Sequence, residues 1–159
     1  IGSNTKNLTN GSSRNRRRWH DTTIRFPSEE WAACFVEELN QNQEYAKAAR
    51  KWEGSFLFVV TAGPQLERDF LFFMDLWHGH CRDWAILTDR DARKSDFTIE
   101  GPLENWVGLL RGEIDPIKGL MSRKFKLRGS MFKVIRNVGA ASELAKNSER
   151  VPTEFPDNS

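Results

Sequence analysis

The sequence predicts an α+β fold in which helices pack on a five-stranded, mainly antiparallel sheet. Apolar residues recur with a helical period up to about Lys51 and with a period of two from Gly54 onward. The predicted strands follow one another through short connections, which favours antiparallel hairpins over strands that alternate with helices. Helical periodicity returns only after Glu100, so the helices are grouped at the two ends of the domain.

Length and charge divide the chain into one domain with a tail at each end. The 159 residues are 38% hydrophobic, which is sufficient for one globular core. Residues 1–25 hold six basic groups against Asp21, and the rest holds 18 basic against 21 acidic residues, so the net charge of +2 arises in the N-terminal tail. We expect a disordered basic tail over 1–22, a folded domain over 23–147 and a flexible tail over 148–159.

The two cysteines are too few for a disulfide framework, which predicts reduced thiols and a cytoplasmic protein. No apolar run is long enough to cross a bilayer and no signal peptide is visible. Because the chain starts at Ile1, removal of a leader remains open. The run from Arg14 to Trp19 could hold phosphate, but an unstructured solvated arm is the favoured interpretation, so no nucleic-acid partner is expected.

Two helices are predicted before the strands. Ser28 is an N-cap, followed by Glu29 and Glu30 in the first turn, where the helix dipole favours acidic residues. A second helical segment spans 43–51. The inward residues of the two helices are Trp31, Cys34, Phe35 and Leu39 in the first, and Tyr45, Ala48 and Ala49 in the second.

Five short segments have the alternation of strands: 54–61, 69–77, 83–87, 95–100 and 124–128. A His78-Gly79 turn separates the second from the third, and a polar loop at 89–94 separates the third from the fourth. The second strand is apolar on both faces, with Phe70, Phe72, Met74 and Leu76 on one and Leu71, Phe73, Asp75 and Trp77 on the other. Both faces must therefore be covered.

Three helices are predicted in the C-terminal part. Gly101-Pro102 opens the first, which ends at Arg111-Gly112; Asp115 caps the second with Pro116 at its first position; and Ser130 caps a helix from Met131 to about Leu144. Their inward residues are Leu103, Trp106, Val107 and Leu110, then Ile117, Leu120 and Met121, then Met131, Val134, Ile135 and Val138. Residues from Asn147 onward are predicted to form a loose tail.

Three motifs match a known pattern: FMDLWHG at 73–79, SDFTI at 95–99 with the helix WVGLLRG at 106–112, and DP at 115–116 continuing to KFKLRGSM at 124–131. On these motifs the chain resembles the sterol carrier protein type 2 family of lipid-binding domains over about 31–147. Arg123 and Ser130 depart from the family's Gly and Asn. The resemblance implies helices on one side of the sheet and a hydrophobic tunnel for a lipid or acyl chain. The C-terminal Asp157-Asn158-Ser159 is not a peroxisomal address, so that role is not carried over.

The resemblance implies non-catalytic lipid binding or transfer, since periodicity alone favours a plain core for the same residues. The segments that match the family's tunnel are 106–110, 117–121, Phe125, Leu127 and 131–138. The predicted lipid-binding residues are Phe72, Met74, Trp106, Leu109, Leu110, Ile114, Ile117, Leu120, Met121, Phe125, Leu127, Met131 and Ile135.

Other functions remain as alternatives. The same fold could be an interaction module that forms a homodimer through Leu71, Phe73 and Trp77. His78, His80 and Cys81 invite a zinc site, but no fourth ligand is evident, so no metal or cofactor is expected. The sequence has no nucleophile elbow, phosphate loop or zinc-protease helix, and we predict that it is not an enzyme.

One charge pattern suggests a membrane partner. No acidic residue lies between Asp115 and Glu143, whereas seven basic residues do: Lys118, Arg123, Lys124, Lys126, Arg128, Lys133 and Arg136. This segment could make transient contact with an anionic membrane, or it could be a solvated rim around an apolar segment.

Overall fold

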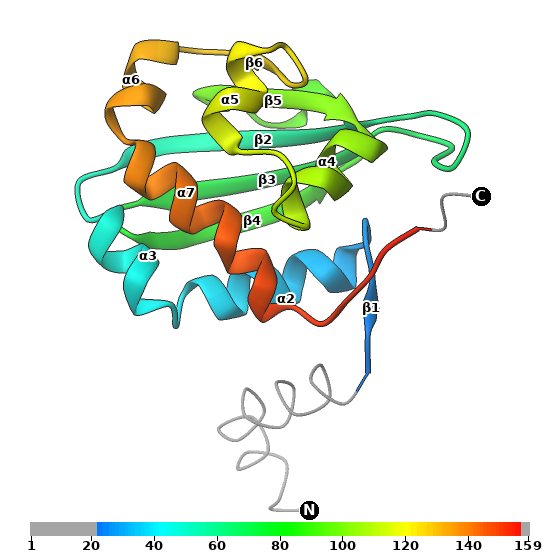
Figure 1. The fold of residues 1–159 in the computed structure, drawn as a ribbon, viewed down its shortest axis with the longest axis horizontal. Helices are drawn as coiled ribbons and strands as arrows, with labels where there is room; N and C mark the ends of the chain where they lie inside the picture. The colour runs from blue at the N-terminus through cyan, green and yellow to red at the C-terminus, as the bar shows by residue number, and fades with distance from the viewer. Residues whose placement is uncertain (1–21, 157–159) are drawn as a thin grey trace, which may run out of the picture.

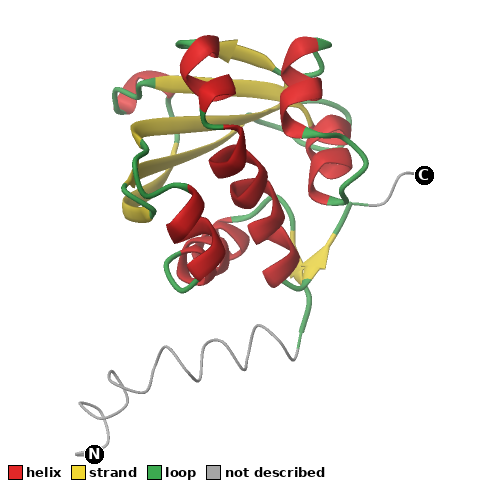
Figure 2. Ribbon diagram, turned by 60° about the vertical axis from the view of Figure 1, so that its left-hand side comes forward, coloured by secondary structure: helices red, strands yellow, loops and turns green. Residues whose placement is uncertain are grey.

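The computed structural model describes residues 22–156 as one mixed sheet with helices against one of its faces (Figures 1 and 2). The main sheet has the strand order β4-β3-β2-β5-β6. Its strands are β2 (Glu53–Thr61), β3 (Phe70–Trp77), β4 (His80–Leu87), β5 (Phe97–Pro102) and β6 (Lys126–Arg128). The helices are α2 (Glu29–Leu39), α3 (Gln43–Ala48), α4 (Leu103–Leu110), α5 (Pro116–Met121), α6 (Met131–Arg136) and α7 (Val138–Lys146).

The predicted five-stranded, mainly antiparallel sheet is confirmed, with one difference in how its strands connect. β3 pairs antiparallel with β2 and β4, and β6 pairs antiparallel with β5. β5, however, pairs parallel with β2, so β4 and β5 are joined by a crossover and not by a hairpin. The crossover contains the short 3₁₀ helix η1 (Arg90–Ala92), where the sequence predicts a polar loop.

The β3–β4 hairpin turns at His78 and Gly79, as the sequence predicts. Both residues have positive φ angles, 49° and 84°, as the two central residues of a tight hairpin turn require. A side chain at Gly79 would place its Cβ 2.7 Å from the carbonyl oxygen of Ala46. Glycine therefore lets the hairpin approach α3 closely.

The two faces of β3 divide as predicted, and the chain itself covers both. Phe72 and its neighbours on the same face point toward the helices. On the other face Leu57, Val59, Leu71 and Phe73 form a separate buried cluster, which we call the back cluster. The crossover between β4 and β5 passes over it, and the Arg93 guanidinium lies 4.1 Å from the centre of the Phe73 ring.

The predicted helix starts agree with the side-chain caps. Ser28 Oγ accepts a hydrogen bond from the backbone N–H of Trp31, and Ser130 Oγ accepts one from that of Lys133. Asp115 Oδ2 accepts two, from the N–H groups of Ile117 and Lys118. These caps satisfy amide groups that a helix leaves unpaired at its N-terminus, which is why the local signals are reliable.

The inward faces of the last helices are only partly as predicted. Met121, Ile135 and Val138 are exposed by 67%, 40% and 52%, and Ala48 in α3 is also exposed. The predicted helix 131–144 is two helices, because Asn137 has non-helical backbone angles of −116° and 40°. Val138 lies beyond this break and does not share the face of Val134, so the burial predicted for it is wrong. The burial predicted for Met121 and Ile135 is also wrong, because each lies in a helix of six residues, which is too short for periodicity to fix its orientation.

The segment after Asn147 differs from the predicted flexible tail. It forms the 3₁₀ helix η2 (Asn147–Arg150) and the strand β7 (Thr153–Glu154), which pairs parallel with β1 (Ile24–Arg25). Asn147 is fully buried, where its amide donates to the carbonyl oxygen of Phe35 and accepts from Asn42. The predicted basic tail over 1–22 lies, apart from Thr22, outside the described residues.

Candidate functional site

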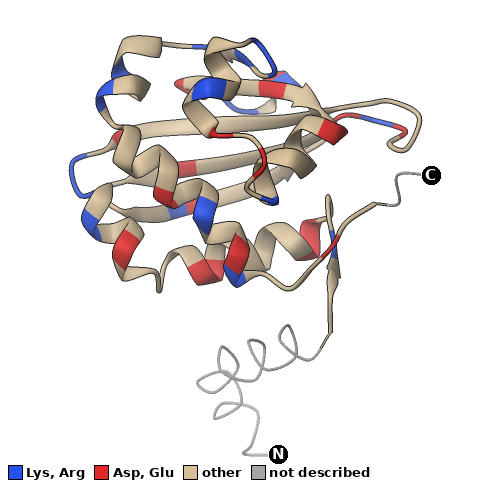
Figure 3. Cartoon of the chain, viewed as in Figure 1, with Lys and Arg blue, Asp and Glu red and all other residues tan. Residues whose placement is uncertain are grey.

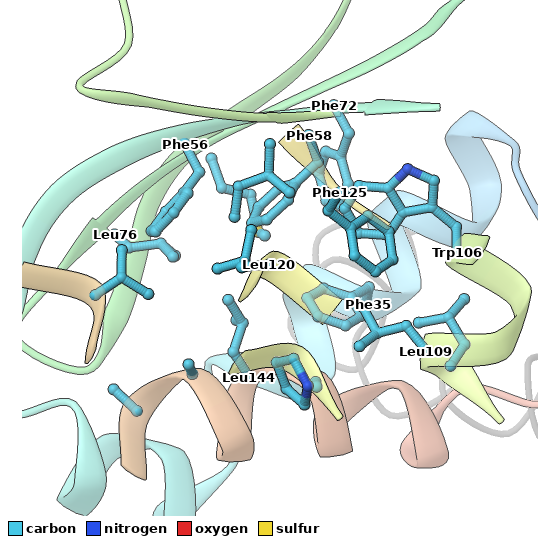
Figure 4. Close-up of a pocket in the computed structure, with 18 of the residues that line it drawn as sticks. Phe35, Phe56, Phe58, Phe72, Leu76, Trp106, Leu109, Leu120, Phe125 and Leu144 are labelled. Atoms are coloured by element: carbon cyan, nitrogen blue, oxygen red, sulfur yellow. The ribbon is translucent and has the colours of Figure 1, made fainter. Parts of the chain in front are cut away.

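An apolar cavity lies between the sheet and the helices. Its volume is about 130 Å³. Figure 4 shows Phe56, Phe58 and Phe72 reaching into it from the strands, with Leu120 and Leu144 opposite. An engineered apolar cavity of about 150 Å³ stays dry and binds benzene. This cavity is therefore large enough to hold part of an apolar ligand in the structure as it stands.

The lining is almost entirely hydrocarbon. No Asp, Glu, Lys, Arg, His, Ser or Cys is among the described residues that line the cavity. Besides the residues named above, the lining consists of Phe26, Trp31, Phe35, Tyr45, Trp52, Val60, Phe70, Met74, Leu76, Ile99, Trp106, Leu109, Leu110, Pro116, Ile117, Phe125, Val134, Asn137, Ala140, Ala141 and Ala145. Such a surface binds through burial of apolar area and can supply little polar specificity.

Trp106 and Phe125 hold one wall together. The Trp106 indole donates a 2.9 Å hydrogen bond to the carbonyl oxygen of Val59, which ties α4 to β2. Its ring lies 4.7 Å from that of Phe125, edge to face. Phe125 in turn needs glycine beneath it, since a Cβ on Gly101 would lie 2.8 Å from its Cδ1. The position of this aromatic pair thus depends on the indole hydrogen bond and on glycine, which has no side chain, at position 101.

Eight of the thirteen predicted lipid-binding residues line the cavity, which places them where a ligand could touch them. They are Phe72, Met74, Trp106, Leu109, Leu110, Ile117, Leu120 and Phe125. Contact of these eight with a lipid stays a prediction.

The other five predicted residues are not part of the lining. Met121 and Ile135 are exposed. Ile114 packs against Gly108 and Gly119, Leu127 pairs with Ile99 at the sheet edge, and Met131 is half-buried.

Sequence reasoning missed the aromatic part of the lining that lies before β3. The sequence predicts Phe35 as an inward residue of the first helix and assigns no binding role to Trp52, Phe56 or Phe58, yet all four line the cavity. For the two residues on β2 the available signal is the alternation of the strand, which groups Phe56 and Phe58 on one face. Phe56 is paired with Met74 and Phe58 with Phe72, so that face is the one that β3 turns toward the cavity.

The residues considered for zinc have separate environments. His78 Nε2 lies 2.6 Å from Glu53 Oε2, and Cys81 Sγ donates to the carbonyl oxygen of Asp83. Burial raises the pKa of the Cys81 thiol to about 12, so the thiol stays protonated at neutral pH. Among residues 22–156 no group of three or more His, Cys, Asp or Glu side chains is placed to hold a metal ion.

Basic and apolar side chains share the surface outside α5, α6 and the start of α7. Figure 3 shows Lys and Arg on α5 and α6, while acidic residues lie along α2. Here Phe132 is 69% exposed, and Met121, Ile135 and Val138 are the other exposed apolar residues. No helix within the described part of the chain has both the length and the apolar character needed to traverse a membrane.

Comparison with known proteins gives one family and several solved structures. A family model described as the SCP-2 sterol transfer family matches residues 33–142. A crystal structure of sterol carrier protein 2 is 31% identical with a TM-score of 0.70, and the match covers 78% of this chain and 97% of that one. Curated protein sequences give no match.

Two further structures show the same fold. A conserved hypothetical protein from Thermus thermophilus, described as a candidate sterol carrier protein, is 31% identical with a TM-score of 0.73, covering 83% of this chain and 92% of that one. Sterol carrier protein 2 from Yarrowia lipolytica in its apo form is 17% identical with a TM-score of 0.54, covering 77% and 92%, which shows likeness of fold alone.

Proposed function

The chain belongs to the SCP-2 sterol transfer family, and from this premise we propose that it binds and transfers a lipid or fatty acyl chain. The observation that carries the proposal is the apolar cavity of about 130 Å³ between sheet and helices. Each methylene group buried there would contribute roughly 0.8 kcal/mol. The described lining holds no group that could act as a nucleophile or general base at neutral pH, which supports binding without catalysis.

Access to the cavity is proposed to come from movement of the helices that cover it. α5 and α6 are six residues each, and α7 starts at a break in helical geometry. Helices this short are held by packing and not by their own hydrogen bonds. Ile117 and Leu120 of α5 and Val134 of α6 all line the cavity, so a displacement of these helices would open it directly.

Native mass spectrometry of the purified protein is the direct test of the function. We expect the folded protein to carry, or to take up from added fatty acid, a ligand that organic solvent extracts and whose mass identifies a lipid. The same spectrum reports metal and oligomeric state. A protein that purifies without ligand and then takes up neither fatty acids nor fatty alcohols would contradict the proposal.

The alternative of an interaction module that dimerises through the outer face of the sheet finds no support. Leu71 and Phe73 are each 3% exposed, and the Arg93 guanidinium of the crossover lies 4.1 Å from the centre of the Phe73 ring. Trp77 is 36% exposed, but the Arg82 guanidinium lies 4.2 Å from its ring centre. The apolar area left for a partner on this face is therefore small.

Transient contact with an anionic membrane is a further part of the proposal. Phe132 could enter the interface, and the Arg136 guanidinium lies 5.2 Å from the centre of its ring. The other exposed basic residues of the same segment are Lys118, Arg123, Lys124, Lys126 and Arg128. Each basic residue near an anionic surface contributes about 1 kcal/mol. Because Lys133 is engaged with the carbonyl oxygen of Glu53, it is left out of this surface.

The double variant Lys118→Glu with Lys126→Glu is expected to lose binding to anionic vesicles by at least about tenfold, since it reverses two charges at the surface. Flotation with phosphatidylserine-containing vesicles at low salt measures it. The matched control, Arg50→Glu with Lys51→Glu, makes the same charge change at exposed positions elsewhere. Equal losses in both variants would count against a defined docking surface.

The cysteines support the cytoplasmic location that the sequence predicts. Cys34 and Cys81 are both buried and free, and burial raises the pKa of the Cys34 thiol to about 12. Thiols in this state are compatible with a reducing compartment.

A further inference from the structure

The helix α6 covers part of the cavity but buries little surface of its own. Val134 is the one buried residue of this helix, and it lines the cavity. Met131 is half-buried, and Phe132, Ile135 and Arg136 are exposed. Because a helix of six residues is not stable by itself, α6 depends on contacts with the rest of the protein. One buried valine side chain is a small contact for this purpose.

Lys133 provides a second contact, at the place where β2 begins (Figure 1). Its ammonium group donates a hydrogen bond to the carbonyl oxygen of Glu53. The same nitrogen lies 4.8 Å from the centre of the Trp52 ring and 5.6 Å from that of Phe97. Both distances are within the range in which a cation is attracted to the face of an aromatic ring. Lys133 therefore joins α6 to the β2 and β5 region of the sheet. We call this set of interactions the Lys133 contact.

The two rings under the ammonium group belong to a fixed part of the protein. Trp52 is 5% exposed and Phe97 is 3% exposed. Both rings pack against Phe56, with ring centres 5.6 Å and 5.0 Å away. The indole N–H of Trp52 is bonded to the carbonyl oxygen of Gly54, which fixes the orientation of the ring. Because the rings are held in this way, the part that can move when the Lys133 contact breaks is α6.

The Lys133 contact is also one that can break at low cost. The side chain is only half-buried, and its hydrogen bond to the Glu53 carbonyl lies at an exposed position. A lysine ammonium group is strongly hydrated, so on leaving this position it would regain contact with water. Exposed contacts of a charged group are accordingly weaker than buried ones. Such a contact can favour the closed position of a short helix without locking it.

We propose that Lys133 is a positioning residue for ligand exchange, whose contact with Glu53, Trp52 and Phe97 holds α6 closed over the cavity. The inference rests on the proposed function and names the residue that controls the movement of α6. Lys133 is not part of the described lining, so it does not contribute to what the ligand contacts once inside. Entry and exit pass through the same open state. Loss of the Lys133 contact therefore raises both rates and leaves the equilibrium affinity nearly unchanged.

The variant Lys133→Met tests the proposal, because it keeps the apolar stem of the side chain and removes the ammonium group. Stopped-flow fluorescence measures the binding of cis-parinaric acid and its release into an excess of oleate. Both rate constants should rise by about five- to twentyfold, a range that allows for the exposure of the contact, while the dissociation constant stays within about twofold. Without ligand, backbone amides over 132–137 should exchange hydrogen faster than in the wild type.

Lys146→Met is the matched control. It removes the ammonium group of an exposed lysine on α7 that lies 4.0 Å from Glu143 of the same helix, so no contact with the sheet is involved. Its ligand-exchange rates and its amide exchange over 132–137 should stay within about twofold of the wild type.

Three results would overturn the role of Lys133: unchanged rates in Lys133→Met, equal rises in both variants, or a lower affinity at an unchanged association rate. The last of these is the effect of a lost ligand contact. A wild-type protein that does not bind cis-parinaric acid would count against the proposed function. Amide exchange would then still decide whether Lys133 holds α6, because that measurement needs no ligand.

Discussion

Ile117→Trp should abolish lipid binding while the protein still folds. Ile117 lines the cavity from α5 and is half-buried, so a larger side chain has a route outward without breaking the core. An indole placed here would fill much of a space of about 130 Å³. We expect uptake of a fluorescent fatty acid to fall by at least about 50-fold, because the ligand would lose most of its buried methylene contacts. Far-UV circular dichroism reports that the fold is kept.

Met121→Trp is the matched control. Met121 lies one turn further along α5 and is 67% exposed, so the same substitution adds an indole outside the cavity. Binding should stay within about twofold of the wild type. If both variants lost binding equally, the effect would belong to α5 as a whole, and the cavity would not be the binding site.

Trp106→Ala is expected to lower the free energy of unfolding by about 3–5 kcal/mol, the usual cost of truncating a buried aromatic residue. Trp106 is 7% exposed, contacts Phe58 and Phe125, and bonds to the backbone of β2. Its removal would leave a void next to an existing cavity and an unpaired carbonyl group on Val59. Urea unfolding, followed by the far-UV signal, measures the change.

Two further variants show how much of that loss of stability comes from the indole hydrogen bond and how much from the burial of the ring. Trp106→Phe keeps most of the ring but removes the indole N–H, so it should cost roughly 1–2 kcal/mol. Trp77→Ala truncates the same residue type at a position 36% exposed and should cost less than about 1.5 kcal/mol. A loss in Trp106→Ala no greater than that in Trp77→Ala would show that Trp106 does not join α4 to the sheet.

Local signals in the sequence predict the fold well because their physical causes are local. Asp115 with Pro116 and Ser130 with Lys133 place two helix starts correctly, since a cap bonds to amides only two or three residues away. The side-chain alternation of β3 is correct for the same reason. The connection from β4 to β5 is not local, because the pairing of β5 with β2 depends on what can cover Leu71 and Phe73.

The cavity lining is predicted less completely than the fold, because the lining depends on how neighbouring strands are paired and how short helices are oriented. The resemblance predicts Trp106 and Phe125 as binding residues, because both lie in segments that match the family's tunnel, and both line the cavity. Phe56 and Phe58 are not predicted, because the sequence of one strand does not state which residues of the neighbouring strand its own residues are paired with. Met121 and Ile135 fit a helical stripe, but a six-residue helix is too short for periodicity to fix its orientation.

The back cluster stabilises the sheet through contacts that do not change when the cavity opens. Leu57, Val59, Leu71 and Phe73 join β2 and β3 on the face away from the helices, beneath a segment that takes no part in the lining. The central strands therefore keep one packed face whatever α5 and α6 do. Ligand exchange can then proceed as a rearrangement of the helical layer over an unchanged platform, which is a smaller event than partial unfolding.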